Sequence, residues 1–288
     1  MTRARAPHWK AIVAATDFSP GARAAATTAA DLTARGGRLT LVHAVQLPPF
    51  NIQLLLKAQG VTDPRAAWLE EAKIELGRHA ARVRRPGMTV ETRAGVGEPW
   101  KVIVGAARDR GADLVVIGRS GHSKVDRLLL GSTAERVVRR SPVPVLVVSR
   151  AMAGIGRVLL PFDLGRGSRI ALDYVAARFP KGVALEAIHV VPRSIAPWWR
   201  ADAERQTAAL QSFLGSTGAT RATLLAEVAN DAAEGILRRA RRGRFDLIVL
   251  ATHGRGGVAR AFMGSVAEKV VRYAREPVLV VPGPGRGR

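Results

Sequence analysis

The chain repeats itself, and the repeat limits the folds that are open to it. Leu39–Val45 is answered 146 positions later by Leu185–Val191, and Asp113–Gly118 is answered 133 positions later by Asp246–Ala251. The 13-residue difference between the two spacings places extra material in the first copy, and we expect it within 46–63. Self-similarity at such a spacing indicates that one structural unit has been duplicated. The sequence therefore predicts a tandem duplication.

The length agrees with two domains. At 288 residues the chain exceeds the roughly 100–200 residues that a single domain commonly has. We expect the first domain over 1–150 and the second over 156–284, with Ala151–Ile155 as the linker.

Within each copy, short apolar runs alternate with segments of helical period. Strands are expected in the first copy near 11–16, 39–45, 88–94, 113–118 and 144–149, helices near 20–35, 64–85, 98–110 and 133–141, and strands in the second copy near 157–162, 183–190, 222–228, 246–251 and 277–281. Almost continuous Val, Ile and Leu strands are typical of a sheet buried on both faces. Strands separated by helices indicate parallel βαβ units with right-handed crossovers. The predicted class is α/β, with a doubly wound parallel sheet in each half.

The chain is strongly basic. It has 45 Lys and Arg against 23 Asp and Glu, a formal net charge of +22, with arginines clustered at 82–85, 139–140 and 238–242. One interpretation is a nucleic-acid or other polyanion partner. The other is a solvated basic surface, and it is favoured because no aromatic residues alternate with the basic ones as in single-strand binders.

Other sequence features concern location. No apolar run approaches the roughly 20 residues that cross a membrane, and no secretory signal is recognisable after the basic residues 1–10. The chain has no cysteine, so it can form no disulfide and no thiolate site. We expect a cytoplasmic protein with no membrane partner.

Ligands of doubly wound sheets bind beyond the carboxyl ends of the strands. Asp17 follows the first strand, and Asp163 holds the same place in the second copy. Each carboxylate can accept hydrogen bonds from a ribose or a base, or it can cap a helix, and the residue type alone does not decide between the two. His43 and His189 lie inside apolar strands, so they are interpreted as packed, hydrogen-bonded histidines.

A glycine-spaced loop follows the fourth strand in each copy. Glycine lets backbone amides approach an anion closely, and a helix that begins at the end of such a loop favours phosphate. The repetition of the spacing in both copies favours a phosphate site over a loop that serves tight packing alone. The candidate residues of the first loop are Gly118, Gly121, Gly131, Ser132 and Thr133, with Lys124 as a counter-charge, and those of the second are Gly254, Gly264 and Ser265.

Motifs of several enzyme classes are missing from the sequence. There is no dinucleotide fingerprint G-x-G-x-x-G after the first strand, no NTPase P-loop, and no G-x-S-x-G nucleophile elbow. No spacing of His, Asp and Glu suggests a metal site. Catalysis is therefore not expected.

The spacing G-x2-G-x9-G-[S/T], matched by Gly118, Gly121, Gly131 and Ser132, resembles that of the universal stress protein family. The early Asp17 and the histidine of the second strand support the resemblance, which covers nearly the whole chain twice. It implies an adenine nucleotide α-hydrolase-like sheet of order 3-2-1-4-5 in each half. It also implies that the last strands pair the two halves within the chain, and it allows a homodimer of the whole chain.

The glycine motif marks the members of that family that bind ATP. The resemblance thus implies a nucleotide-binding stress protein with a regulatory or protective role, ATP with or without Mg²⁺ as its ligand, and no robust catalysis; a slow ATPase or a polyanion binder is the alternative. Ala251 replaces the first glycine in the second half, which disfavours binding there. The implied ATP-site residues are Ala15, Thr16, Asp17, Ala44, Ile117, Gly118, Arg119, Gly121, Gly131, Ser132 and Thr133 in the first half, and Asp163, Val190, Gly254, Gly264, Ser265 and Val266 in the second.

Overall fold

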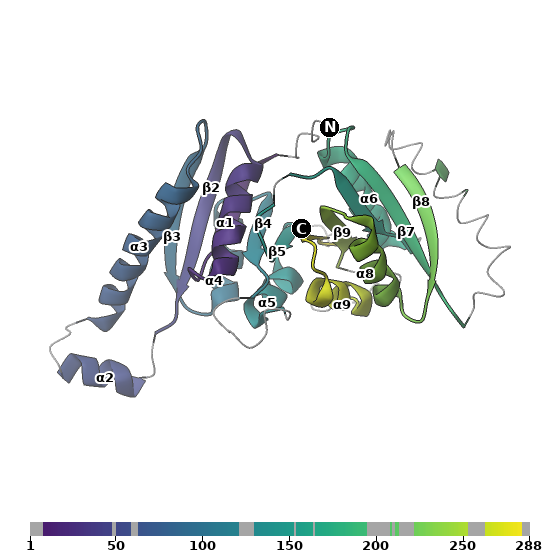
Figure 1. The fold of residues 1–288 in the computed structure, drawn as a ribbon. Helices are drawn as coiled ribbons and strands as arrows, with labels where there is room; N and C mark the ends of the chain where they lie inside the picture. The colour runs from purple at the N-terminus through teal and green to yellow at the C-terminus, as the bar shows by residue number, and fades with distance from the viewer. Residues whose placement is uncertain are drawn as a thin grey trace.

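The structure, a computed structural model, shows two similar α/β halves side by side (Figure 1). It describes residues 8–47, 50–58, 63–120, 130–152, 154–163, 165–194, 208, 211–212, 222–252 and 263–283. The first half contains β1 (Trp9–Ala15), α1 (Pro20–Leu32), β2 (Thr33–Val45), α2 (Phe50–Ala58), α3 (Pro64–Val83), β3 (Thr89–Val96), α4 (Pro99–Asp109), β4 (Leu114–Gly118), α5 (Ser132–Arg140) and β5 (Val145–Val148). The second half contains β6 (Arg157–Pro161), α6 (Arg166–Arg178), β7 (Ala184–Pro192), β8 (Ala222–Ala229), α8 (Ala232–Gly243), β9 (Leu247–Ala251), α9 (Ser265–Tyr273) and β10 (Val278–Val281).

All ten strands form one sheet, in the order β3-β2-β1-β4-β5-β10-β9-β6-β7-β8. Each half has the predicted order 3-2-1-4-5 with parallel pairing, so the predicted fold is confirmed. The sheets are not separate, because β5 and β10 pair antiparallel at the junction. Leu146 lies opposite Leu279, which is its own counterpart in the repeat. The junction therefore has a local two-fold symmetry.

The helices cover both faces of this sheet. One buried apolar cluster joins the sheet to α1, α3 and α6, and the other joins it to α4, α5, α8 and α9. Leu146 and Leu279 belong to the first cluster, and Val147 and Val278 belong to the second. Each cluster thus continues across the junction, so the two halves share their hydrophobic cores.

The first helix begins as predicted but ends earlier. Ser19 caps α1, where its hydroxyl accepts the amide hydrogen of Ala22 at 3.2 Å, and Pro20 opens the helix. The predicted end at residue 35 is wrong, because α1 ends at Leu32. Just beyond the helix, Gly36 has a φ of +78°, a left-handed conformation that an α-helix does not contain.

The extra segment of the first copy contains a helix that the sequence did not predict. This helix, α2, projects from the end of the molecule in Figure 1. Its side chains Phe50 and Leu55 are 80% and 55% exposed. The predicted linker, in contrast, is packed into the protein where it is described. Met152 and Ile155 are buried, and the Met152 amide donates to Thr28 Oγ1 at 3.1 Å.

Candidate functional site

The predicted site lies at the carboxyl ends of β1, β2 and β4. Because β1 pairs with both other strands, Ala15, Ala44 and Gly118 end up at the same edge of the sheet. The chain continues the pairing for one more residue, since the Thr16 amide donates to the Val42 carbonyl at 2.8 Å. Ile117 is buried beneath this edge. The structure therefore brings the residues predicted from these three strands together.

Thr16 is held from three sides. His43 Nδ1 lies 2.8 Å from the Thr16 carbonyl oxygen, and His79 Nδ1 lies 3.2 Å from the Thr16 hydroxyl. The Phe18 amide donates to the same hydroxyl at 3.0 Å. In the second half His189 Nδ1 makes the equivalent contact with the Phe162 carbonyl, also at 2.8 Å. The two strand histidines are thus hydrogen-bonded framework residues, as the sequence indicated.

His79 of α3 was not among the predicted residues. Its side chain is buried, and its Nε2 atom has no hydrogen-bond partner among the described residues. Burial lowers the pKa of His79, and the nearby charges of Arg82 and Arg23 lower it further. The imidazole beneath the candidate site is therefore neutral at pH 7. No periodicity in the sequence distinguishes it from an ordinary helical residue.

A pocket of about 280 Å³ opens beside Thr16, between the end of β2 and α3. Phe18, His43 and Trp68 line it together with Glu71 and Glu75. The Phe18 and His43 rings lie 4.6 Å apart between centroids. This concave, partly aromatic space can hold a flat ring at the edge of the candidate site.

The two aspartates at the strand ends each order the turn that follows. Asp17 accepts the amide hydrogen of Ser19 at 3.0 Å. Asp163 accepts the Gly165 amide at 2.8 Å and the Ser168 hydroxyl at 2.7 Å. Both carboxylates remain half-buried at the sheet edge, so they combine a local structural contact with a position beside the site.

The two ends of each glycine-spaced loop are joined by one hydrogen bond. Gly131 N donates to the Arg119 carbonyl at 2.8 Å, and Gly264 N donates to the Thr252 carbonyl at 2.8 Å. The predicted residues Gly121, Lys124 and Gly254 lie between these anchors, outside the described residues.

Each loop leads directly into a helix without a side-chain cap. Gly131 is the N-cap of α5 and Gly264 is the N-cap of α9, and neither helix start receives a side-chain hydrogen bond from the described residues. The first amides of an uncapped helix attract an anion, and the helix dipole adds to the attraction. Ser132 and Ser265 are exposed at these starts, with Thr133 and Val266 half-buried beside them. Both halves therefore have a helix start whose first amides receive no side-chain cap from the described residues.

Gly118 has a packing role that the sequence did not reveal. A Cβ added there would lie 2.7 Å from the carbonyl carbon of Gly21, so β4 and the start of α1 touch through their backbones. Gly118 does not have a positive φ. Ala251 occupies the equivalent place in the second half and is half-buried. In the first half, the absence of a Cβ at position 118 thus allows α1 to lie close to the end of β4.

The wall of the site also differs between the halves. Val190 replaces Ala44 at the end of the second strand, and its methyl group lies 2.7 Å from where a Cβ of Gly235 would be. The first-half counterpart of Gly235 is Val102. The first half thus has the larger side chain on the helix, at Val102, and the second half has it on the strand, at Val190. Val190 therefore places a larger side chain at the predicted adenine position of the second half.

Arg119 is another of the residues expected at the ribose and phosphates. The side chain is buried and turns into the second half, where its guanidinium donates to the carbonyls of Val271 at 2.6 Å and Arg272 at 3.1 Å. Burial lowers the pKa of Arg119 to about 10, which leaves it charged at neutral pH. The backbone of Arg119 still anchors the loop. The sequence did distinguish this position, because the equivalent residue in the second half is the short, uncharged Thr252.

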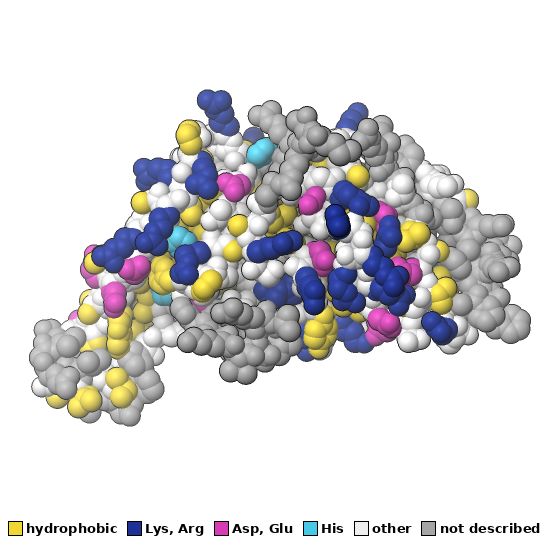
Figure 2. All heavy atoms as spheres, in the orientation of Figure 1, with side chains coloured by type: hydrophobic (Ala, Val, Ile, Leu, Met, Phe, Trp, Pro, Cys, Tyr) yellow, Lys and Arg dark blue, Asp and Glu magenta, His cyan; other side chains and the backbone are white. Residues whose placement is uncertain are grey.

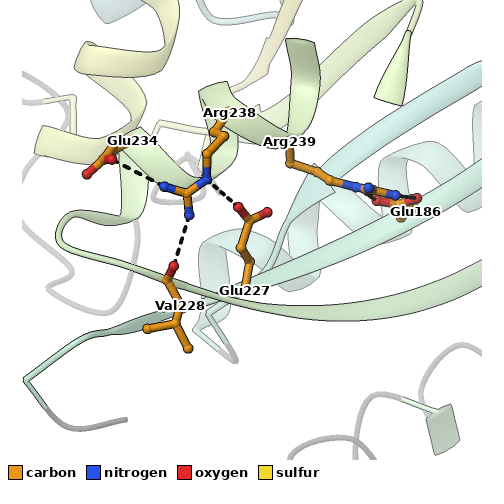
Figure 3. A network of polar contacts seen from close by, with 6 residues as sticks. All are labelled: Glu186, Glu227, Val228, Glu234, Arg238 and Arg239. Carbon is orange, nitrogen blue, oxygen red and sulfur yellow. Dashed lines mark hydrogen bonds and ion pairs between the residues drawn. The ribbon is translucent and has the colours of Figure 1, made fainter. Parts of the chain in front are cut away.

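Part of the basic charge is neutralised within the protein. Basic side chains gather on the visible face of the second half (Figure 2). Figure 3 shows that two arginines of α8 are engaged: Arg238 Nε donates to Glu227 at 2.6 Å, and Arg239 holds both carboxylate oxygens of Glu186 at 2.5 and 2.7 Å. Arg238 also reaches Glu234 at 3.2 Å. These two arginines therefore hold α8 to β7 and β8.

Among the described residues, no group of three or more His, Asp or Glu side chains is arranged to hold a metal ion. In the same part of the chain, no helix has the length and apolarity needed to cross a bilayer.

Comparison with known proteins gives a consistent picture. Residues 8–149 and 154–282 each match the model of the universal stress protein family. A universal stress protein of Mycolicibacterium smegmatis is 29% identical over 211 residues, which cover 68% of this chain and 69% of that protein. One from Thermus aquaticus is 35% identical over 150 residues, covering 49% of this chain and 98% of that protein. The crystal structure of a universal stress protein from Archaeoglobus fulgidus superposes with a TM-score of 0.72 at 22% identity, covering 96% of this chain and 99% of that one, which shows the same fold.

Proposed function

The chain belongs to the universal stress protein family, and we propose that it binds ATP in its first half as a regulatory or protective stress protein without robust catalysis. The observation that carries the proposal is the uncapped start of α5, fixed to the end of β4 by the bond from Gly131 to Arg119. The first backbone amides of α5 are thus available to bind an anion at the edge of the sheet that contains Thr16 and Asp17.

The sheet edge that contains Thr16 and Asp17 supports a nucleotide rather than a free phosphate. The pocket that Phe18, His43 and Trp68 line lies next to Thr16, and aromatic faces suit a purine ring. The Asp17 carboxylate can accept hydrogen bonds from ribose hydroxyls. The net charge of +22 attracts a polyphosphate from solution.

We propose weaker binding in the second half. Gly264 and Ser265 repeat the phosphate end of the site, so the anion contacts are retained. Val190 and Ala251, however, add side-chain volume where the first half has Ala44 and Gly118. The loss falls on the adenosine part of the ligand, so an ADP or ATP phosphate chain binds there with less help from its base.

The proposal does not extend to nucleic acid. Two of the four arginines in the cluster 238–242 are held by carboxylates, as Figure 3 shows, so this cluster presents fewer unpaired cations to a polyanion than its sequence indicates. A slow ATPase is the enzyme alternative. Hydrolysis in a single-turnover assay at a rate well above that of free ATP would favour it.

Mass spectrometry of the nucleotide released from native protein tests the proposal. Ser132→Asp places a negative charge at the start of α5, where it repels phosphate while remaining compatible with a helix start. We expect wild type and Ser265→Asp to retain ATP and Ser132→Asp to lose it. Equal retention by wild type and Ser132→Asp, or failure of wild type to bind added ATP, would reject the first-half site.

A further inference from the structure

The pocket between the end of β2 and α3 differs in charge from the chain as a whole. The chain has 45 Lys and Arg against 23 Asp and Glu, yet the two charged side chains that line the pocket are the carboxylates of Glu71 and Glu75. Rings of Phe18, His43 and Trp68 complete most of its wall, and no Lys or Arg of the described residues lines it. The pocket therefore suits a planar group that donates hydrogen bonds rather than an anion.

One side of α3 supplies both carboxylates. Trp68, Glu71, Ala72 and Glu75 follow one another at spacings of one to four residues that place them on the same side of the helix. Glu75 contacts Arg78 at 2.5 Å, whereas Glu71 forms no ion pair with a described residue. The Glu71 carboxylate is thus available to accept hydrogen bonds from a ligand in the pocket.

His43 contributes a neutral acceptor. Its Nδ1 atom lies 2.8 Å from the Thr16 carbonyl oxygen, which can only accept, so Nδ1 carries the hydrogen of this bond. A neutral imidazole has one N–H, and the bond made by one nitrogen therefore sets the role of the other. Nε2 then has a lone pair, and it makes no hydrogen bond to a described residue. Because the ring lines the pocket, this lone pair is available to a ligand there.

Phe18 fixes the wall against which the His43 ring lies. Its φ of +65° is a conformation that bulky residues rarely adopt. Two hydrogen bonds hold it: the Phe18 amide donates to the Thr16 hydroxyl at 3.0 Å, and the Phe18 carbonyl accepts from Arg23 at 2.5 Å. The Phe18 ring is thereby placed 4.6 Å from the His43 ring between centroids. A wall that is already ordered lowers the entropy lost when a ring binds.

We infer that His43 Nε2 and the Glu71 carboxylate select a purine with an amino group at C6 over a purine with a carbonyl group there. The inference rests on the proposed ATP site of the first half and specifies how its base is recognised. The 6-amino group of adenine donates hydrogen bonds, whereas a 6-oxo group accepts them. A 6-oxo group set against these two acceptors leaves lone pairs without a hydrogen to share, which disfavours binding.

Competition binding with the full chain tests the inference. The probes are ITP, which has a carbonyl group in place of the amino group, and purine riboside triphosphate, which has only a hydrogen there. In wild type we expect each to compete about tenfold more weakly than ATP, because a hydrogen bond to a charged or fixed acceptor is lost. Equal competition by all three nucleotides would overturn the inference and leave the ATP site standing. Failure of ATP itself to bind would instead reject the proposed ATP site, and the inference with it.

Two variants test the residues. His43→Asn keeps a side-chain N–H that can reach the Thr16 carbonyl but has no atom in the place of Nε2, and Glu71→Gln replaces a charged acceptor with an amide of the same size. Each should lower the preference for ATP over ITP about threefold. Glu70→Gln is the matched control, since Glu70 pairs with Lys73 at 3.0 Å and does not line the pocket. An unchanged preference in both His43→Asn and Glu71→Gln, or an equal fall in Glu70→Gln, would contradict the assignment.

Nitrogen NMR of the labelled wild-type chain tests the tautomer itself. Protonated and unprotonated ring nitrogens have well-separated chemical shifts. In mildly alkaline solution we expect His43 to show a protonated Nδ1 and an unprotonated Nε2, and we expect ATP to shift the Nε2 resonance more than ITP does. A protonated Nε2 with an unprotonated Nδ1 would rule out His43 as the acceptor. Neither this measurement nor Glu71→Gln depends on whether His43→Asn folds.

Discussion

The two halves of the molecule share one backbone framework and differ in the side chains that face the candidate sites. The strand histidines His43 and His189 contact equivalent carbonyls at the same 2.8 Å. The loop anchors from Gly131 and Gly264 also have the same length of 2.8 Å. A duplicated fold therefore keeps the hydrogen bonds that hold the edge of the sheet together.

The differences between the halves are in side chains at or next to the candidate sites. Gly118 becomes Ala251, Ala44 becomes Val190, and the buried Arg119 becomes Thr252. The first two changes alter the volume of the site, and the third alters its connection to the other half. Retention of the backbone framework thus does not imply retention of the binding properties.

The largest change in the free energy of unfolding is expected at the junction of β5 and β10, where the two halves are most alike. Leu146 and Leu279 face each other across the junction, and both are fully buried. Replacing either by Ala leaves a cavity that should lower the free energy of unfolding by about 2–5 kcal/mol. Urea unfolding of the two variants should give values within about 1 kcal/mol of each other. A large loss from only one of them would contradict the two-fold equivalence of the junction.

A smaller and one-sided effect is expected at the first loop glycine. Gly118→Ala introduces a Cβ 2.7 Å from the Gly21 backbone, which should cost about 1–3 kcal/mol through displacement of α1. The reverse change in the other half, Ala251→Gly, should cost only about 0.5–1 kcal/mol through the greater freedom of the unfolded chain. Thermal unfolding measures both. Equal losses would show that the backbone contact is not specific to the first half.

A pH-dependent effect is expected from His79. Its pKa is lowered from 6.5 in the folded protein, so below pH 6.5 the unfolded chain takes up a proton that the folded protein does not. The unfolded state then binds more protons, and the free energy of unfolding falls as the pH falls below 6.5. His79→Gln should flatten this part of the stability curve. An unchanged slope between pH 6.5 and pH 5 would show that His79 does not cause it.

The smallest effect is expected from the ion pairs between α5 and α9. Glu135 and Glu268 are repeat counterparts with side chains 28% and 29% exposed, and each contacts both Arg139 and Arg272. Glu135→Gln and Glu268→Gln should each cost about 0.2–1 kcal/mol, and less at high salt. Chemical unfolding at low and high salt distinguishes this from a packing effect, which salt would not reduce.

Most of the fold follows from features that are local in the sequence. Apolar strand runs predict the strands, the resemblance to the universal stress protein family implies their order, and Ser19 with Pro20 predicts the start of α1. The structure also brings the residues at the strand ends together, because the carboxyl ends of parallel strands meet at one edge of the sheet.

The missed features depend on contacts between distant residues. Nothing near Gly118 indicates that Gly21 touches it, and nothing near Arg119 indicates that the end of α9 lies within reach. The His79 contact with Thr16 spans 63 positions. The helix α2 was missed because its segment was interpreted only as inserted material. Comparison of the two copies position by position would have singled out Arg119, since Thr252 differs from it in charge and in length.

The antiparallel pairing of β5 with β10 has a consequence for how such a junction can change. In a dimer of identical subunits, every residue at a two-fold interface occurs twice, so an arginine at position 119 would cross in both directions. Here the partners are encoded separately within one chain, and a substitution on one side leaves the other side as it was. The covalent link therefore permits Arg119 on one side to correspond to Thr252 on the other, inside an interface whose backbone is still symmetric. Because the two halves are fused, each half pairs with a partner whose sequence differs from its own. The effective concentration of that partner is set by the linker and does not fall on dilution.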